Sequence, residues 1–542
     1  PNRLTMNQQN SNWNRFLEWY CKPDETDISL DISRMGFEKA WWSSMQIPMA
    51  NALQQMKELE AGAIANPDEK RMVGHYWLRA PERAPHSELT DSIRANLESI
   101  HHFAKDVLEG RLKPTNSERF RKLLLIGIGG SALGPQLLYQ ALESPPKDGQ
   151  PASGLETYFI DNTDPDGMGR IFSKLGNAFE ETLVLVISKS GGTVETRNGM
   201  LETRNVFEHK NLNFTKHAVA VTGEGSLLDK LAKEEQWLKV FPMWDWVGGR
   251  TSVTSTVGLL PARLQGIDVD AFLEGARLMD QHTRNPEIRQ NPAAMLSLMW
   301  HHAGAGKGER AMVVLPYRDR LESLARYLQQ LVMESIGKEK DLNGNVVEQG
   351  LTVYGNKGST DQHAYIQQLR EGRSDFFTTF VEVLEEPVHE PFEVEPGIRS
   401  GDFLQGFLLG TLEALTEKKR PSLTLSLERL NAKTLGSLIA LYERSVGLYA
   451  SLIGINAYHQ PGVESGKKAA ARIVVLKTRL FSILKSEADQ SFSVDELALK
   501  TGQESDKDLV FNLLESLRIN RRIEGSSESD PSRRRYSIVP EK

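Results

Sequence analysis

The sequence predicts an α/β protein with two parallel-sheet domains, flanking helices and a winged-helix-like extension at its C-terminal end. Short apolar runs alternate with helical patterns between residues 121 and 221, which is typical of a parallel sheet covered on both faces. A second set of such signals begins after about residue 290, and a different pattern begins after Lys467. The length of 542 residues agrees with several domains, because one ordinary core rarely grows so large.

Four segments are therefore expected along the chain. The first carries amphipathic helical patterns and is interpreted as a helical cover. The next two are the sheet domains, and the last is the extension. The expected bounds are 1–115, 116–285, 286–467 and 468–542.

The strands of the first sheet domain are expected at four apolar runs, each followed by a turn. These runs are residues 121–126, 155–160, 182–187 and 217–221. Loops rich in Gly, Ser and Thr follow the first and third runs, at the strand ends where ligands bind in such folds.

The second sheet domain and the extension show weaker patterns. The second domain is expected to have strands at 311–315, 348–353 and 376–384, a helix at 321–336 and a loop at 385–401. The extension is expected to have helices at 469–486, 493–502 and 506–519 and a strand at 533–539. A helical part that ends in a hairpin is the winged-helix-like order.

Composition indicates an ordinary globular protein without a general attraction to nucleic acid or anionic membranes. The formal net charge is -7, and 25% of the residues are charged. Cys21 is the only cysteine, so no internal disulfide forms and a reducing compartment is expected. Neither a secretory signal nor a membrane-spanning run is visible. A cytoplasmic location is expected.

Two loops carry the clearest chemical signals. In Ser188-Lys-Ser-Gly-Gly-Thr193, three hydroxyls and two glycines lie between a strand and a helix, an arrangement that favours phosphate binding. A single hydroxyl would suffice for an ordinary helix N-cap. Gly127-Ile-Gly-Gly-Ser131 could likewise bring backbone N–H groups to an anion, but its spacing differs from the dinucleotide fingerprint and tight packing explains it equally well.

The other candidate residues are unremarkable when each is taken alone. Gln330 and Glu334 are four apart and share a helix face, where a carboxylate in apolar surroundings could serve as a general base. Arg250 follows two glycines, His363 lies in a turn-rich segment, and Lys467 follows a Gly-bounded run. A solvated or structural role is the common one for such residues.

Taken together and in order, these segments resemble the phosphoglucose isomerase family, which is built from two sugar-isomerase domains. Four blocks match the family's order, and the 333–338 and 362–363 segments lie between them. The blocks are residues 125–135, 187–196, 245–252 and 462–467. The resemblance covers roughly residues 35 to 480.

The resemblance implies a reversible aldose–ketose isomerisation of glucose 6-phosphate and fructose 6-phosphate in glycolysis and gluconeogenesis. The reaction would proceed through ring opening and a cis-enediolate. Glu334 matches the base, Arg250 the cation that stabilises the enediolate, and His363 and Lys467 the ring-opening pair. The phosphate would bind Ser131, Ser188, Ser190, Thr193 and Gln330.

A homodimer without a cofactor or metal is also implied, because Arg and Lys supply the charge. The sequence contains no HExxH, EF-hand or clustered Cys/His pattern.

Three positions depart from the family pattern. Thr251 replaces an aromatic residue, Ile336 replaces an Asn of many members, and His459 lies in an altered Tyr458-His-Gln-Pro461 run. None of these changes removes a charged catalytic group, so they bear on subfamily and kinetics more than on the reaction.

Two other functions would need different sequence features. A sugar-phosphate-binding regulator with a DNA-binding tail would need the phosphate loop but no base. The presence of Arg250, Glu334, His363 and Lys467 therefore favours the enzyme. A glucosamine-phosphate synthase would need an N-terminal amidotransferase domain with a catalytic Cys, and Cys21 does not fit that place.

The part beyond about residue 470 is interpreted as an addition, since family members commonly end soon after the last signature helix. Its basic clusters at 518–522 and 533–535 are diluted by acids, so a packing or oligomerisation module is preferred over a nucleic-acid partner. The sequence leaves open the use of mannose 6-phosphate, the ligand of the extension and regulation.

Overall fold

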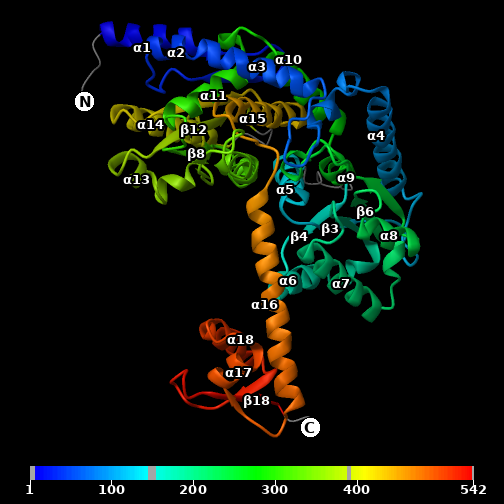
Figure 1. The fold of residues 1–542 in the computed structure, drawn as a ribbon. Coiled ribbons are helices and arrows are strands. Elements are labelled where there is room, and N and C mark those ends of the chain that lie inside the picture. Colours follow the sequence, from blue (N-terminus) through cyan, green and yellow to red (C-terminus); the bar gives the residue numbers. More distant parts are fainter. Residues whose placement is uncertain (1–5, 144–153, 387–391, 540–542) are drawn as a thin grey trace. The chain divides into compact units, whose positions relative to one another are not determined.

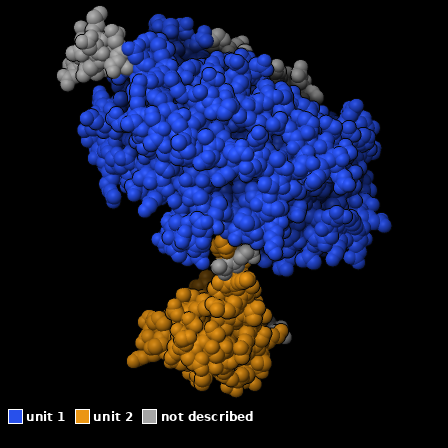
Figure 2. Space-filling view, turned by 45° about the horizontal axis from the view of Figure 1, so that its top comes forward, with its two compact units in different colours: residues 1–459 blue, residues 460–542 orange. Residues whose placement is uncertain are grey.

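The computed structural model describes residues 6–143, 154–386 and 392–539, without the side chains of residues 6–11 and 463–465. The chain divides into two compact units, Pro1–His459 and Gln460–Lys542 (Figure 2). The sheets of both predicted domains lie within the first unit, whereas the predicted second sheet domain, 286–467, extends past the end of this unit at His459. The domain bounds at residues 115, 285 and 467 stay a prediction.

The first sheet has five parallel strands and confirms the four predicted ones. Alternate residues of each strand enter separate apolar cores: Leu123 and Leu125 pack on one face, Leu124 and Ile126 on the other. Helices cover both faces, α5 (Leu133–Leu142) and α9 (Thr256–Leu264) on one and α6 (Pro165–Leu175), α7 (Val194–His209) and α8 (Leu227–Glu234) on the other (Figure 1). In spatial order the strands are β4 (Glu156–Ile160), β3 (Lys122–Ile126), β5 (Thr182–Ile187), β6 (Ala218–Thr222) and the additional β7 (Lys239–Pro242).

The second sheet has six strands, and the N-terminal segment supplies two of them. The four strands from β15 to β11 are parallel, whereas β1 and β2 add to the β15 edge in antiparallel pairing. Residues 1–115 are therefore more than the expected helical cover. In spatial order the strands are β1 (Tyr20–Cys21), β2 (Ile28–Asp31), β15 (Ser422–Leu427), β12 (Phe376–Val383), β8 (Ala311–Pro316) and β11 (Val353–Tyr354).

Three details of the second domain differ from the prediction. The strand expected at 348–353 is divided between β11 and a separate antiparallel pair, β9 (Lys338–Lys340) and β10 (Val346–Gln349). The helix expected at 321–336 consists of α12 (Leu324–Leu328) followed by the π-helical turn η9 (Gln329–Glu334). The described part of the expected loop contains a short hairpin, β13 (Glu393–Glu395) and β14 (Ile398–Arg399).

Helix α15 (Ala432–Leu452) is the central element of the first unit. It is buried from Thr434 to Ala450 and packs against α3, α10 and α11. The first unit also contains further α-helices. The bounds are α1 (Met6–Trp19), α2 (Lys39–Ser44), α3 (Gln46–Glu60), α4 (Ser87–Leu108), α10 (Val269–Thr283), α11 (Pro292–Ala303), α13 (Ile366–Glu371) and α14 (Ser400–Glu417).

The second unit has its own apolar core, which includes Leu480, Leu497, Leu514 and Tyr536. Its helices confirm the three predicted ones, and its three strands form an antiparallel sheet in the order β16-β18-β17. Assignment to the winged-helix class stays a prediction. The elements are α16 (Pro461–Ser486), β16 (Phe492–Ser493), α17 (Val494–Thr501), α18 (Lys507–Ile519), β17 (Ile523–Gly525) and β18 (Arg535–Ile538). Within the described ranges, no helix is long and apolar enough to cross a bilayer.

A buried ion network joins α3, α10 and α15 in the first unit. Arg79 donates to both carboxylate oxygens of Asp280 at 2.7 and 2.9 Å and also pairs with Glu443. Arg444 donates to Asp280 at 2.8 Å and to Glu60 at 2.6 Å. Burial alone would raise the pKa of Glu60, but its arginine partners, with Arg444 first, outweigh burial and lower the pKa to about 2. These charges are stable in the interior because each has a partner of opposite sign.

We expect Asp280→Asn to destabilise the protein by about 3–5 kcal/mol, because it leaves two buried arginines without their shared carboxylate. Denaturant unfolding would measure the change. Asp270→Asn is the matched control, since Asp270 lies on the same helix with 68% of its side chain exposed. Equal unfolding midpoints for Asp280→Asn and the control would contradict a stabilising role for the network.

Candidate active site

The first sheet provides a place for a ligand through its topology. Counted along the chain, its strands lie in the order 2-1-3-4-5, so the connections reverse direction between β3 and β5. In open α/β sheets, ligands bind outside the carboxyl ends of the strands at this reversal. The loops after β3 and β5 are the two that the sequence singled out, Gly127 to Ser131 and Ser188 to Thr193.

The loop after β3 packs closely against the segment that contains Arg250. Its residues form the 3-10 turn η3 (Gly129–Ser131), which contacts η6 (Gly249–Thr251). A Cβ atom on Gly130 would lie 2.0 Å from the carbonyl oxygen of Gly249. Only glycine at position 130 permits this contact of two backbones.

The loop after β5 keeps its hydroxyls at the start of α7. Ser188 donates to Thr193 Oγ1 at 3.3 Å and accepts from the N–H of Gly191 at 3.2 Å, while Ser190 is exposed. Thr193 stands at the N-cap position, but its side chain makes no capping hydrogen bond. The first N–H groups of α7 are therefore not satisfied by the cap side chain, which suits an anion at the helix N-terminus.

Lys189 connects this loop to the arginine segment. Its Nζ donates to the carbonyl oxygens of Asp245 at 3.0 Å and Val247 at 2.9 Å. Burial, followed by the nearby Arg71, lowers the pKa of Lys189 to about 8. The sequence prediction assigned no role to Lys189, although its place inside the loop was a usable signal.

Arg250 and Glu334 form an ion pair at the centre of the candidate site. Arg250 Nε lies 3.3 Å from Glu334 Oε2, and the two side chains are 4% and 21% exposed. Arg250 also donates to the carbonyl oxygens of Ala457 at 2.6 Å and His459 at 3.3 Å. Burial lowers the pKa of Arg250, whereas Glu334 acts in the opposite direction. The pair holds a fixed cation beside a partly accessible carboxylate.

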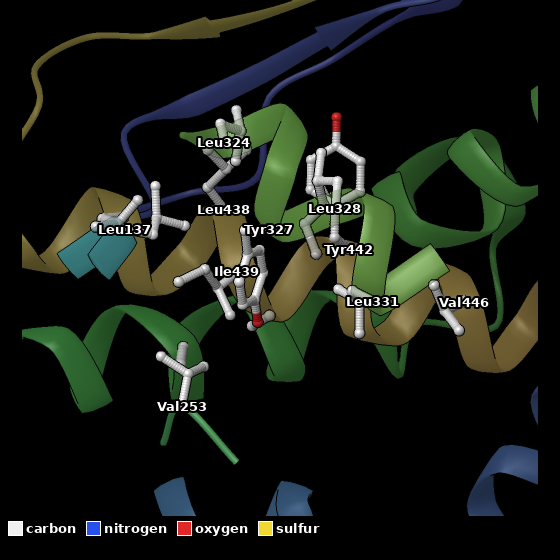
Figure 3. Packing of buried hydrophobic residues seen from close by; sticks show 14 of the residues in the cluster. Leu137, Val253, Leu324, Tyr327, Leu328, Leu331, Leu438, Ile439, Tyr442 and Val446 are labelled. Atoms are coloured by element: carbon white, nitrogen blue, oxygen red, sulfur yellow. The ribbon is translucent and has the colours of Figure 1, made fainter. Parts of the chain in front are cut away.

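A π-helical turn positions Glu334. Such turns are rare in proteins overall, but they occur frequently at functional sites. Figure 3 shows how the preceding residues pack: Tyr327, Leu328 and Leu331 lie against Ile439, Tyr442 and Val446 of the buried helix α15. Glu334 therefore follows a stretch of helix whose apolar side chains pack against α15.

Gln330 lies at the first glycine loop. Its Nε2 is 3.1 Å from where a Cβ on Gly129 would lie. A cavity of about 240 Å³ opens beside it, lined by Ile128, Gly129, Ala132, Leu133, Asp161, Arg326, Gln329 and Gln330. The structure thus brings Gln330, the Ser131 loop, Arg250 and Glu334 into neighbouring turns, since η6 also contacts η9.

The structure shows no described bond between His363 and this pair, and Lys467 belongs to the other compact unit. His363 is exposed at the end of η10 (Thr360–His363), and among the described residues no hydrogen bond or ion pair joins it to Arg250 or Glu334. The neighbouring Gln362 donates to the carbonyl oxygen of Phe407 on α14 at 3.2 Å. Lys467 lies on α16 of the second unit, and the side chains of residues 463–465 before it are outside the described set.

The three departures from the family pattern occupy defined places. Thr251 and Ile336 are buried, and Thr251 donates to the carbonyl oxygen of Gly248 at 3.3 Å. His459 Nε2 lies 3.6 Å from a carboxylate oxygen of Asp68. Across the described ranges, no group of three or more His, Cys, Asp or Glu side chains gathers as metal ligands do.

Comparison with known proteins gives one consistent result. The family described as "Phosphoglucose isomerase" matches residues 43–390 and 412–491. A "Glucose-6-phosphate isomerase" of Nostoc punctiforme is 55% identical over 512 residues, covering 94% of this chain and 95% of that protein. One from Geobacter is 54% identical over 513 residues. A crystal structure of a glucose-6-phosphate isomerase from Chlamydia trachomatis is 27% identical with a TM-score of 0.76, covering 87% of this chain and 94% of that chain.

The comparisons show how far the C-terminal extension is shared: the family match ends at residue 491, whereas the alignment with a relative extends further. The Nostoc alignment leaves out only 6% of this chain, a part much shorter than the unit Gln460–Lys542. More than half of the second unit therefore lies within the alignment, and these relatives share it.

Proposed function

The chain belongs to the phosphoglucose isomerase family, and from this we infer that it interconverts glucose 6-phosphate and fructose 6-phosphate. This is an aldose–ketose isomerisation through ring opening and a cis-enediolate, a step of glycolysis and gluconeogenesis. The observation that carries the inference is the Arg250–Glu334 pair at 3.3 Å, beside the loops at the sheet's reversal point. The regulator alternative is not favoured, because relatives named glucose-6-phosphate isomerase align with this chain over nearly their whole length.

Glu334 serves as the base in this proposal. Its carboxylate removes the proton from C2 of the open-chain aldose and returns it to C1, and the reverse reaction uses the same two positions. The developing negative charge lies on the two oxygens of the enediolate. The neighbouring Arg250, 4% exposed and held by backbone carbonyls, supports this charge without having to reorganise. A preorganised donor of this kind is worth roughly 3–4 kcal/mol in a comparable oxyanion site.

The substrate phosphate is proposed to bind the loop after β5 together with the first glycine loop. Ser188, Ser190 and Thr193 provide hydroxyls at the N-terminus of α7, and Ser131 and Gln330 come from the neighbouring turns. The support is the side chain of Thr193, which bonds within the loop instead of capping its helix. A phosphate can therefore receive both hydroxyl and backbone donors.

Ring opening is proposed for His363 and Lys467, which the family resemblance implies. His suits proton transfer near neutral pH, and Lys can donate to the ring oxygen. The chain leaves the first unit at His459, whose carbonyl accepts from Arg250, and Lys467 follows eight residues later. The role proposed for Lys467 rests on the family resemblance alone.

We also propose a homodimer that covers one face of α14. Phe403 and Phe407 lie one turn apart on this helix with their rings 6.4 Å apart, and both are exposed. Exposed aromatic side chains of this kind mark association surfaces. His363 is exposed and lies near this face, since the adjacent Gln362 donates to the backbone carbonyl of Phe407. A second copy on α14 would therefore shield His363 from solvent.

A cytoplasmic location and an extension that does not bind nucleic acid complete the proposal. The only cysteine, Cys21, is buried, and burial raises the pKa of its thiol to about 11, which leaves it protonated and unreactive.

In the extension, Arg518 and Arg534 pair with Glu515, and Arg535 pairs with Glu496. Such internal pairs weaken the attraction of the basic clusters to phosphate backbones.

A coupled assay with fructose 6-phosphate and a chelator tests the function directly. We expect turnover to persist in the chelator, because the proposed catalytic charges are side chains. In the same assay, Thr193→Val should raise KM about tenfold or more with a smaller loss of kcat, since a lost hydrogen bond to a charged group is worth about 1.5–3 kcal/mol.

Thr478→Val is the matched control for this assay, because Thr478 lies on an exposed stretch of α16. Absence of turnover in the wild-type protein would contradict the function. Loss of activity in the chelator that zinc or magnesium restores would contradict the metal-free mechanism. An unchanged KM in Thr193→Val would remove Thr193 from the phosphate site.

Phe407→Asp is expected to convert the proposed homodimer into single chains, because it places a charge in the apolar face of α14. Sedimentation velocity would show the mass of one chain instead of two. Leu227→Asp is the control, since Leu227 is 66% exposed on α8 in the first sheet domain. A wild-type protein that sediments as one chain, or a Phe407→Asp variant that remains a dimer, would refute this interface.

A further inference from the structure

Lys338 is a buried lysine that completes the end of the helix carrying Glu334. In a continuing helix, the carbonyl oxygen of Glu334 would accept the backbone N–H of residue 338. Here the helix has ended and Lys338 begins strand β9. Its side chain replaces the missing donor: Lys338 Nζ donates to the carbonyl oxygen of Glu334 at 2.6 Å. Lys338 is 5% exposed, so little water competes for this carbonyl.

The same ammonium group reaches a second carbonyl, on the segment that leads out of the first unit. Lys338 Nζ donates to His459 O at 3.0 Å, and Arg250 Nη2 donates to the same oxygen at 3.3 Å. Arg250 also holds the carbonyl of Ala457 at 2.6 Å. Lys338 and Arg250 thus both bond to backbone carbonyls of residues 457–459, and Lys338 also bonds to the turn that carries Glu334.

The burial and the charges around Lys338 affect its protonation, but the two bonds do not require a charged amine. Burial and then Arg250 lower the pKa of Lys338 to about 7, while Glu334 and Asp68 oppose this shift. A neutral amine retains two N–H groups, so both carbonyl bonds survive deprotonation. An apolar side chain of similar length would avoid the burial of charge, but it would leave both carbonyls without this donor.

We propose that Lys338 is a positioning residue for the isomerisation, which sets the backbone of Glu334 against the 457–459 segment. The inference rests on the proposed function of Glu334 as the base. Lys338 bonds to the backbone of Glu334 and to that of His459, which Arg250 also contacts. These bonds fix the position of the proposed base relative to Arg250 and to residues 457–459. Misplacement of a reacting group by about 1 Å can cost a hundredfold in rate.

The test compares Lys338→Met with Lys340→Met in the fructose 6-phosphate assay. Methionine keeps the length of the side chain and removes the donor, and Lys340 is an exposed lysine two residues along the same strand. We expect Lys338→Met to lower kcat by about tenfold or more with KM within about threefold, because the phosphate loop is untouched. Lys340→Met should match the wild type. Lys338→Arg, which restores donors, should recover part of kcat.

Several outcomes would overturn the proposal. These are a kcat of Lys338→Met within twofold of the wild type, a rise in KM at unchanged kcat, or no recovery with arginine. If Lys338→Met does not fold, Lys338→Leu, which also lacks a donor, is measured against the same limits. Wild-type activity in the same assay separates the two hypotheses. An inactive wild type contradicts the proposed function, whereas an active wild type with an unaffected Lys338→Met contradicts only the role of Lys338.

Discussion

The ion pair of Arg250 and Glu334 is the contact on which the rest of the site depends. Arg250 follows the strands of the first sheet in the chain, and Glu334 follows β8 of the second sheet. The pair, 3.3 Å apart, joins η6 to η9, and η9 also contacts the buried helix α15. A buried guanidinium is unfavourable without partners, so folding and assembly of the pair support each other. The geometry of the proposed site therefore depends on how η6 and η9 pack against each other.

Backbone contacts hold the surroundings of this pair in place. Gly130 lets the first loop approach Gly249 to a distance that no other residue allows. Lys189 donates to two carbonyl oxygens in the segment before Arg250. Lys338 donates to two others, one of them at the end of the helix that carries Glu334. Carbonyls at loops and helix ends lack partners within their own element. Lys189 and Lys338 supply the missing donors to these carbonyl oxygens.

The sequence predicted the elements whose signal is local. The strands before Gly127 and Ser188 are continuous apolar runs that end in glycine-rich turns, and both loops lie where the pattern placed them. Long-range pairing was not predictable: Leu30 pairs with Leu425, almost four hundred residues away, so the strands at the N-terminus appeared only in the structure. The π-helical turn at Glu334 has the same apolar spacing as an α-helix. The roles of Lys189 and Lys338 depend on burial, which spacing does not reveal.

The most direct measurement of the central claim is deuterium exchange at C2 of glucose 6-phosphate in D₂O, followed by NMR, in Glu334→Gln. Glutamine keeps the shape of the side chain and cannot accept the proton. A general base contributes ~10²–10⁴-fold, so the account predicts a loss of exchange of at least that order while sugar-phosphate binding and anomerisation above the solution rate persist. Glu339→Gln, an exposed neighbour, should exchange like the wild type. Exchange near the wild-type rate in Glu334→Gln would mean that another residue is the base and would contradict the account.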